Sequence, residues 1–102
     1  MAVLHINQQS FSELESSDKK VLIDFYADWC GPCRMLAPVI EELAAEYPQY
    51  AIAKINVDNE PELASRFGVF SIPTLVVLQN GQVVDQAVGA QPKARILAML
   101  EK

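Results

Sequence analysis

Hydrophobic residues along this chain fall into two kinds of run, which predict strands and helices in alternation. Val21–Tyr26 is an almost continuous apolar stretch of strand length, as is typical of a strand covered on both faces. From Pro32 or Cys33 to Tyr47, apolar residues instead recur every three or four positions, which predicts a long amphipathic helix. The remaining strands are predicted at Val3–Ile6, Ala51–Val57, Thr74–Gln79 and Gln82–Val88.

Polar and small residues between these runs predict where the shorter elements begin and end. Ser10 and Glu13 have the spacing of a capping box, which predicts a short helix that reaches about Ser16. Pro61–Phe67 predicts a second short helix, and Gly68 is expected to end it.

The second half of the chain sets the predicted fold class. Asn80-Gly81 between two apolar runs predicts a tight hairpin, and Pro92–Glu101 predicts a final amphipathic helix. Pro38 lies inside the long helix, where it is expected to kink the axis. Strand–helix–strand units need parallel pairing and the hairpin needs antiparallel pairing. We therefore predict an α/β fold, with a central mixed sheet of about five strands flanked by about four helices.

Length and composition favour one folded domain over residues 1–102. The chain is 51% hydrophobic and 21% charged, and it shows no repeat or linker. Its net charge of -5 argues against nucleic-acid binding through a basic face. No apolar stretch is long enough to cross a membrane, and the first residues do not resemble a signal peptide, so a cytoplasmic location is expected.

The candidate chemistry centres on two cysteines, Cys30 and Cys33, which lie between a predicted strand and the long helix. A helix N-terminus presents unpaired N–H groups and a positive dipole end, which stabilise a thiolate. Cys30 is therefore a candidate nucleophile, and Cys33, one turn later and expected to be less exposed, is placed to resolve a mixed disulfide. Pro32 suits the first turn of the helix.

Two other uses of this cysteine pair are less favourable. A structural disulfide that closes so short a loop would contribute only about 2 kcal/mol. A zinc site normally needs four ligands, whereas the chain offers two thiols and the distant His5, which is more simply a strand residue. We therefore favour a redox pair.

Asp24 is a second candidate, because it interrupts an otherwise apolar strand. Burial would raise the pKa of its carboxyl group and suit it to exchange a proton with the Cys33 thiol. The alternative is an Asp that faces solvent at a sheet edge. Lys54 could pair with Asp24 if their strands adjoin, although a lysine in a strand is usually solvated.

Five stretches of the sequence together resemble the thioredoxin family. They are Val21–Pro38 with its Trp-Cys-Gly-Pro-Cys motif, Lys54–Asp58, Ser71–Leu75, Asn80-Gly81 and Val88–Ala90. The resemblance implies the thioredoxin fold, with Cys30 as attacking and Cys33 as resolving thiol. It further implies that Asp24 is a buried proton relay with Lys54 as its partner, and that Pro73 is a cis-proline beside the disulfide. The apolar docking surface it implies for substrates consists of Trp29, Gly31, Pro32, Ile72, Gly89 and Ala90.

The function implied by this resemblance is reduction of disulfides in target proteins by a monomer without a bound cofactor. A thioredoxin reductase that draws on NADPH or ferredoxin would re-reduce the cysteine pair. An oxidase or isomerase on the same fold, and a binding module with incidental redox chemistry, are the alternatives. Gly31-Pro32 resembles the reducing members. Phe70 departs from the family, which often has a polar or basic residue there; it either widens the docking surface or packs inward.

Overall fold

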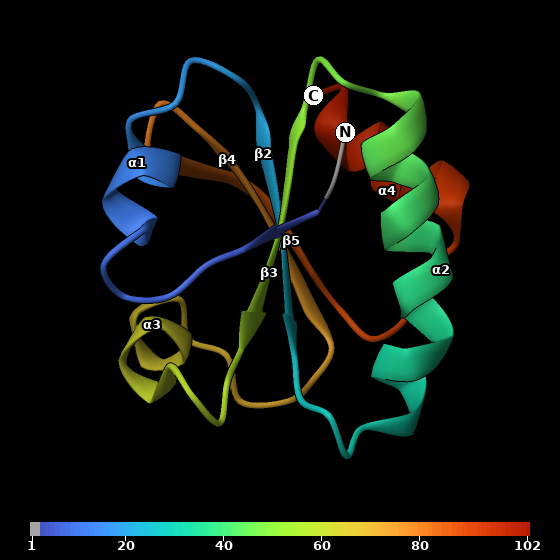
Figure 1. Ribbon diagram of the computed structural model, residues 1–102. Helices are drawn as coiled ribbons and strands as arrows, with labels where there is room; N and C mark the ends of the chain where they lie inside the picture. The colour runs from blue at the N-terminus through green and yellow to red at the C-terminus, as the bar shows by residue number, and fades with distance from the viewer. Residues whose placement is uncertain (1–2) are drawn as a thin grey trace.

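The fold is a five-stranded sheet with helices against both faces, and a computed structural model describes it over residues 3–102 (Figure 1). The order of strands across the sheet is β1-β3-β2-β4-β5. β1, β3 and β2 run parallel, whereas β4 is antiparallel to both β2 and β5. The strands are β1 (Leu4–His5), β2 (Val21–Tyr26), β3 (Ala51–Asn56), β4 (Thr74–Gln79) and β5 (Gln82–Val88). The predicted mixed sheet is confirmed.

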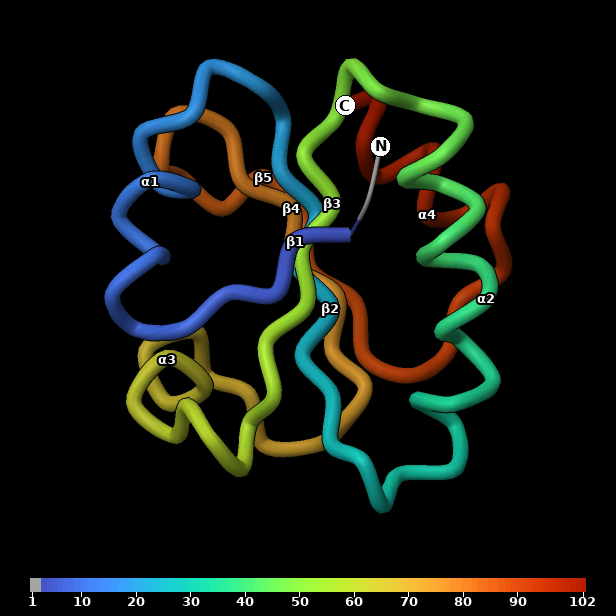
Figure 2. The backbone as a smooth tube through the Cα atoms, in the orientation of Figure 1, coloured from blue at the N-terminus to red at the C-terminus, as the bar shows by residue number. Residues whose placement is uncertain are grey.

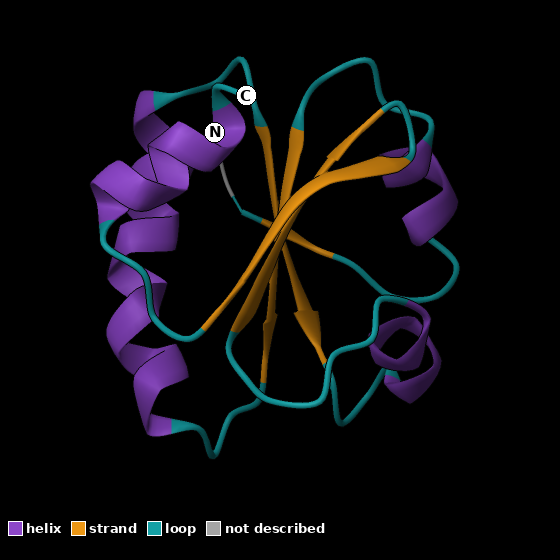
Figure 3. Cartoon of the chain, turned by 180° about the vertical axis from the view of Figure 1, so that it is seen from behind, coloured by secondary structure: helices purple, strands orange, loops and turns teal. Residues whose placement is uncertain are grey.

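The helices form the two outer layers of the molecule. Figures 1 and 2 show helices on both sides of the sheet, and Figure 3 shows the same arrangement from behind. The helices are α1 (Phe11–Glu15), α2 (Gly31–Glu46), α3 (Pro61–Arg66) and α4 (Lys93–Leu100). Within the described residues, no helix is long and apolar enough to cross a membrane.

Alternation along the central strand β2 divides the interior into two cores. Leu22 packs in a cluster with residues of α2 and α4, whereas Ile23 and Phe25 pack with residues of α1 and α3. All three side chains are fully buried. This double coverage explains why the strand is apolar at almost every position.

Helix α2 begins at Gly31, one or two residues before the predicted start, because Cys30 already has the extended backbone of an N-cap residue. Pro32 lies in its first turn, as predicted. The helix continues through Pro38, which is exposed, and the kink expected there stays a prediction.

The capping box predicted for α1 is wrong. Ser10 has helical backbone angles, and its side chain makes no cap hydrogen bond to the helix. Its hydroxyl instead accepts from the Asn7 N–H at 3.0 Å, while Asn7 Oδ1 accepts from the Ser10 N–H at 2.9 Å. The hydroxyl and N–H of Ser10, which would form the capping box, are therefore paired with Asn7 instead. The first strand is also shorter than predicted, since its paired residues are Leu4 and His5, and Ile6 adds one hydrogen bond from its N–H to the Lys54 carbonyl at 3.0 Å.

Two turns form as the sequence predicts. Gly68 has φ +65° after α3, and its N–H donates to the Ser65 carbonyl at 3.0 Å, which closes the end of that helix. Asn80 and Gly81 both have positive φ, 53° and 77°, which suits the two-residue hairpin between β4 and β5. These signals are local, so they needed no knowledge of the packing.

Candidate active site

The two cysteines form a disulfide at the point where the chain passes from the centre of the sheet into α2. Their Cα atoms are 5.2 Å apart. Cys30 is the N-cap residue of α2, and its Sγ accepts a hydrogen bond from the Cys33 N–H at 3.2 Å. One of the otherwise unpaired N–H groups of the helix therefore points at this sulfur. A thiolate at Cys30 would accept the same bond more strongly, because it would carry a full charge.

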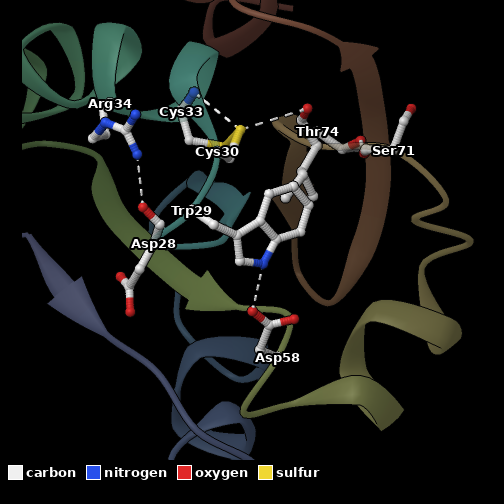
Figure 4. The surroundings of a disulfide bond; sticks show 9 residues. Asp28, Trp29, Cys30, Cys33, Arg34, Asp58, Ser71 and Thr74 are labelled. Carbon is white, nitrogen blue, oxygen red and sulfur yellow. Dashed lines mark hydrogen bonds between the residues drawn. A yellow bond between two sulfur atoms is a disulfide. The ribbon is translucent and has the colours of Figure 1, made fainter.

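The first turn of α2 also favours a negative charge on the Cys30 sulfur. It contains no acidic residue that would oppose a thiolate. The Arg34 side chain of this turn is held in place, because its guanidinium donates to the Asp28 carbonyl at 2.9 Å (Figure 4). This bond joins the start of the helix to the loop that leads into Cys30. The loop itself is closed by the Cys30 N–H, which donates to the Ala27 carbonyl at 3.2 Å.

The expected difference in exposure between the cysteines has the predicted direction but is small in the disulfide form. Cys30 is 4% exposed and Cys33 is 3% exposed, because both pack in a small cluster with Ala27, against Ile72. The two sulfurs are distinguished by their hydrogen-bonding surroundings rather than by burial. Cys30 Sγ lies 3.8 Å from the Ile72 carbonyl oxygen.

The segment that faces Cys30 comes from the second half of the chain, just before β4. The peptide bond between Ile72 and Pro73 is cis, as the family resemblance implied. Thr74 fixes the same segment through its hydroxyl, which donates to the Ser71 carbonyl at 2.6 Å (Figure 4). The Gly89 N–H donates to the Pro73 carbonyl at 2.7 Å. The fold thus brings Ile72, just before β4, against Cys30, and Gly89, just after β5, is joined to the same segment through Pro73.

Trp29 presents an exposed indole ring beside the disulfide. Its side chain is 68% exposed, yet its Nε1–H donates to an Asp58 carboxylate oxygen at 2.8 Å (Figure 4). Sequence reasoning assigned no role to Asp58. A signal was available, since Asp58 follows β3 as Trp29 follows β2, and the carboxyl ends of adjacent parallel strands lie at one edge of a sheet. Asp58 therefore fixes the orientation of the indole.

The other predicted docking residues come from two segments of the chain, one at the disulfide and one after β5. Gly31 and Gly89 are half-buried, whereas Pro32 and Ala90 are exposed. Pro32 lies between the two cysteines, and Ala90 follows the glycine that bonds to Pro73. These positions are compatible with a surface around the sulfurs.

Asp24 lies fully buried in the central strand, so the alternative of a solvent-facing carboxylate is wrong. Neither of its carboxylate oxygens has a hydrogen-bond partner within the described chain. Burial raises the pKa of this carboxyl group to about 6, and the charge of Lys54 opposes the rise. A group with this pKa can take up and release a proton near neutral pH.

Lys54 lies beside Asp24 in the register of the two parallel strands, as predicted. A direct pair is not formed, however, since the carboxylate oxygens are unpartnered in the described residues. The Lys54 ammonium lies over the Tyr26 ring instead, 4.2 Å from its centroid. Lys54 therefore acts on Asp24 through its charge, and the aromatic face holds the ammonium.

Comparison with known proteins gives the same picture. The family model for thioredoxin matches residues 2–102. The chain belongs to the thioredoxin family. It is 52% identical over 92 residues to a thioredoxin of Chlorobaculum thiosulfatiphilum, covering 89% of this chain and 85% of that protein. It is 48% identical over 103 residues to a thioredoxin of Staphylococcus haemolyticus, covering 100% of this chain and 98% of that one.

Solved structures confirm the thioredoxin fold. A mutant thioredoxin from Halobacterium salinarum NRC-1 superposes with a TM-score of 0.92 at 42% identity. The alignment covers 98% of this chain and 88% of that one. With the Cys30–Cys33 pair, family membership makes this thioredoxin-family chain a dithiol–disulfide oxidoreductase.

Proposed function

We propose that this chain works as a reductase of protein disulfides, with Cys30 as the attacking thiol and Cys33 as the resolving thiol. The observation that supports this assignment best is the N-cap position of Cys30, whose sulfur accepts the Cys33 N–H at 3.2 Å. Stabilisation of a thiolate at a helix N-terminus raises the fraction of Cys30 that is in the attacking, thiolate form, which supports Cys30 as the nucleophile of the pair.

The proposed cycle transfers two electrons from the cysteine pair to the target. The Cys30 thiolate attacks one sulfur of the target disulfide, forms a mixed disulfide and releases the other target sulfur as a thiolate, which takes up a proton. The Cys33 thiol loses its proton, and its thiolate attacks Cys30. The Cys30–Cys33 disulfide forms, and the second target sulfur leaves as a thiolate that is then protonated.

Asp24 is proposed to accept the Cys33 proton in the second step. Its raised pKa, about 6, means that it is mostly ionised at neutral pH and yet basic enough to bind a proton during turnover. Lys54 is proposed to limit the rise in this pKa by its positive charge. Neither side chain needs to touch the target for these roles.

The target is proposed to dock on the surface formed by Trp29, Gly31, Pro32, Ile72, Pro73, Gly89 and Ala90. The exposed indole of Trp29 and the position of the Ile72 carbonyl beside Cys30 support this proposal. An extended target backbone could pair beside Ile72, a binding mode that reads little sequence and so tolerates many targets.

The electron donor is proposed to be a thioredoxin reductase that draws on NADPH or ferredoxin, as the family resemblance implies. The cycle uses the reversible Cys30–Cys33 disulfide and no bound cofactor. The proposed location is the cytoplasm, where a reducing donor keeps such pairs in the dithiol form. The acting species is proposed to be the monomer, because one chain supplies both cysteines and Asp24.

Turnover on insulin tests the proposal. With dithiothreitol as donor, the wild-type chain is expected to accelerate the precipitation of freed insulin chains, and Cys33→Ser is expected to lose that acceleration. The Ser variant can form the mixed disulfide but cannot resolve it. Wild-type protein that does no better than dithiothreitol alone would contradict a general reductase.

The two alternatives predict different outcomes. A binding module should keep its partners when both cysteines are replaced by Ser, whereas a reductase should lose its activity. An isomerase would refold scrambled ribonuclease, and an oxidase would form disulfides in reduced ribonuclease, each more readily than it would reduce insulin. The helix N-cap at Cys30 is what a reductase and an oxidase have in common, because both attack through a stabilised thiolate, so these activity measurements separate the two.

A further inference from the structure

Phe70 is the most exposed large hydrophobic side chain of the described residues, at 98% of its full surface. It lies in the connection between α3 and β4, two residues before Ile72. A phenylalanine ring left wholly in water is unfavourable by itself. Its position close to the reacting sulfur therefore points to a binding role.

The backbone on both sides of Phe70 is held in place. The Val69 N–H donates to the Ala64 carbonyl at 2.9 Å, and the Ser71 carbonyl accepts from the Thr74 hydroxyl at 2.6 Å. Val69 packs against the core beneath α1 and α3, and Ile72 packs against the cysteines. Because these two neighbours fill the inward positions, the Phe70 ring is directed outward.

The ring borders a groove of about 340 Å³, whose lining includes two residues that adjoin the disulfide. Trp29 lines the groove together with Phe70, and the Asp58 carboxylate holds the Trp29 indole in place at 2.8 Å. Ile72 also lines the groove, and its carbonyl oxygen lies 3.8 Å from Cys30 Sγ. The complete lining consists of Trp29, Val57, Val69, Phe70, Ser71 and Ile72.

We propose that Phe70 is a specificity-determining residue, which with Trp29 receives a large apolar side chain close to the attacked cysteine of a target polypeptide. This inference rests on the proposed reductase function. Ile72 both lines the groove and lies against Cys30, so a target segment that reaches the Cys30 sulfur passes close to the groove. The preferred targets are disulfides that have Leu, Ile, Phe or a similar side chain beside the attacked cysteine.

The size of the groove favours a peptide side chain over a second copy of this chain. Its volume of about 340 Å³ is at the lower end of the range of small-ligand sites, which leaves room for a large side chain but not for a folded chain. A stable dimer would need roughly 800 Å² buried on each partner. A second copy seated there would also cover Cys30 and block the reaction.

The test compares two disulfide-closed peptides that are identical except for Leu or Ser beside one cysteine. Each is mixed with pre-reduced protein, quenched with acid and separated by chromatography to give a second-order rate constant. The wild-type chain is expected to reduce the Leu peptide about tenfold faster than the Ser peptide. Phe70→Ser is expected to lower the rate constant for the Leu peptide about fivefold and leave that for the Ser peptide within about twofold.

Two further variants separate recognition from damage. Phe70→Leu is expected to restore most of the preference for the Leu peptide, because it returns an apolar side chain. Met35→Ser removes another exposed apolar side chain, 77% exposed on α2 and outside the groove lining, and is expected to leave the preference unchanged. Hydroxyethyl disulfide, which has no side chain to place in the groove, is expected to react equally with wild type and Phe70→Ser.

The proposal is overturned if Phe70→Ser slows both peptides and hydroxyethyl disulfide alike, or changes none of them. A Phe70-dependent dimer in sedimentation at assay concentration would also overturn it, by assigning the groove to a second copy. If the wild-type chain reduces neither peptide nor hydroxyethyl disulfide, the reductase function itself fails. Failure of the inference alone leaves wild-type reduction intact without a preference between the peptides.

Discussion

Asp24 is a carboxyl group whose chemistry is set by its surroundings rather than by its type. It is fully buried on the central strand, and its oxygens have no hydrogen-bond partner within residues 3–102. Burial raises its pKa from 3.8 to about 6, against the opposing charge of Lys54. The ionised form is therefore costly to the folded state, while the same rise in pKa suits the group to proton transfer.

Replacement of Asp24 by Asn should expose this cost as a function of pH. Between about pH 4 and 6 the folded protein holds a proton that the unfolded chain has lost, so wild-type stability should fall as pH rises. Above about pH 6 the loss is complete, at about 3 kcal/mol. Urea unfolding should therefore show Asp24→Asn more stable than wild type at pH 7.5 and close to it at pH 4.

The same variant should be slower in insulin reduction, because Asn cannot accept the Cys33 proton. Opposite changes in stability and activity would separate this role from simple damage to the fold. A variant as active as wild type at pH 7 would contradict the proton-acceptor role. A wild-type unfolding free energy that stays level from pH 4 to 7.5 would contradict the raised pKa.

The elements show which local signals were reliable. The end of α3 at Gly68 and the hairpin at Asn80-Gly81 formed as predicted, because positive φ is a property of the residues themselves. The capping box failed because Asn7 competes for the Ser10 groups. The start of α2 was predicted to within two residues, and the N-cap role of Cys30 needed the structure.

Gly81→Ala should test the hairpin. With φ at +77°, an alanine there should cost about 1–2 kcal/mol of unfolding free energy. An added Cβ would meet Glu15 at 3.5 Å, an ordinary contact, so the cost comes from the backbone. Gly31→Ala is the matched control, since nothing lies within 4 Å of its added Cβ and its φ is not positive. Urea denaturation that showed equal effects for both would contradict this explanation.

At the scale of the whole molecule, one sheet supports two cores. Leu22 and Ile23 are neighbours on β2, yet they belong to clusters on opposite faces. Both clusters also include residues of β4. Loss of the packing on one face of the sheet would therefore disturb a strand that the other face needs. We therefore expect the chain to unfold as one cooperative unit, in agreement with the single domain predicted for residues 1–102.

Leu22→Ala and Ile23→Ala test this cooperativity. Each should lower the unfolding free energy by about 2–5 kcal/mol, because both side chains are fully buried. In each variant, far-UV circular dichroism and the fluorescence of the single tryptophan should report one coincident transition. Leu4→Ala, at a side chain that is 45% exposed, should cost less than about 1.5 kcal/mol. Separate transitions for the two faces would contradict a single unit.

The sequence by itself determined the types and order of the elements, the mixed sheet and the cysteine pair at a helix start. Each of these depends on residues within a few positions of one another, so periodicity and turn chemistry were sufficient. Contacts between distant segments needed the tertiary structure. Trp29 meets Asp58, Ile72 lies against Cys30, and Lys54 lies over Tyr26 instead of pairing with Asp24.

Phe70 is a single residue at which the sequence left the orientation open and the tertiary structure decided it. Its sequence context left inward and outward orientations open, because an aromatic side chain in a loop is compatible with either. The packing of Val69 and Ile72 into two different clusters leaves the ring only the outward direction. Burial is a property of the whole arrangement of strands and helices, and it decided the pKa of Asp24 for the same reason.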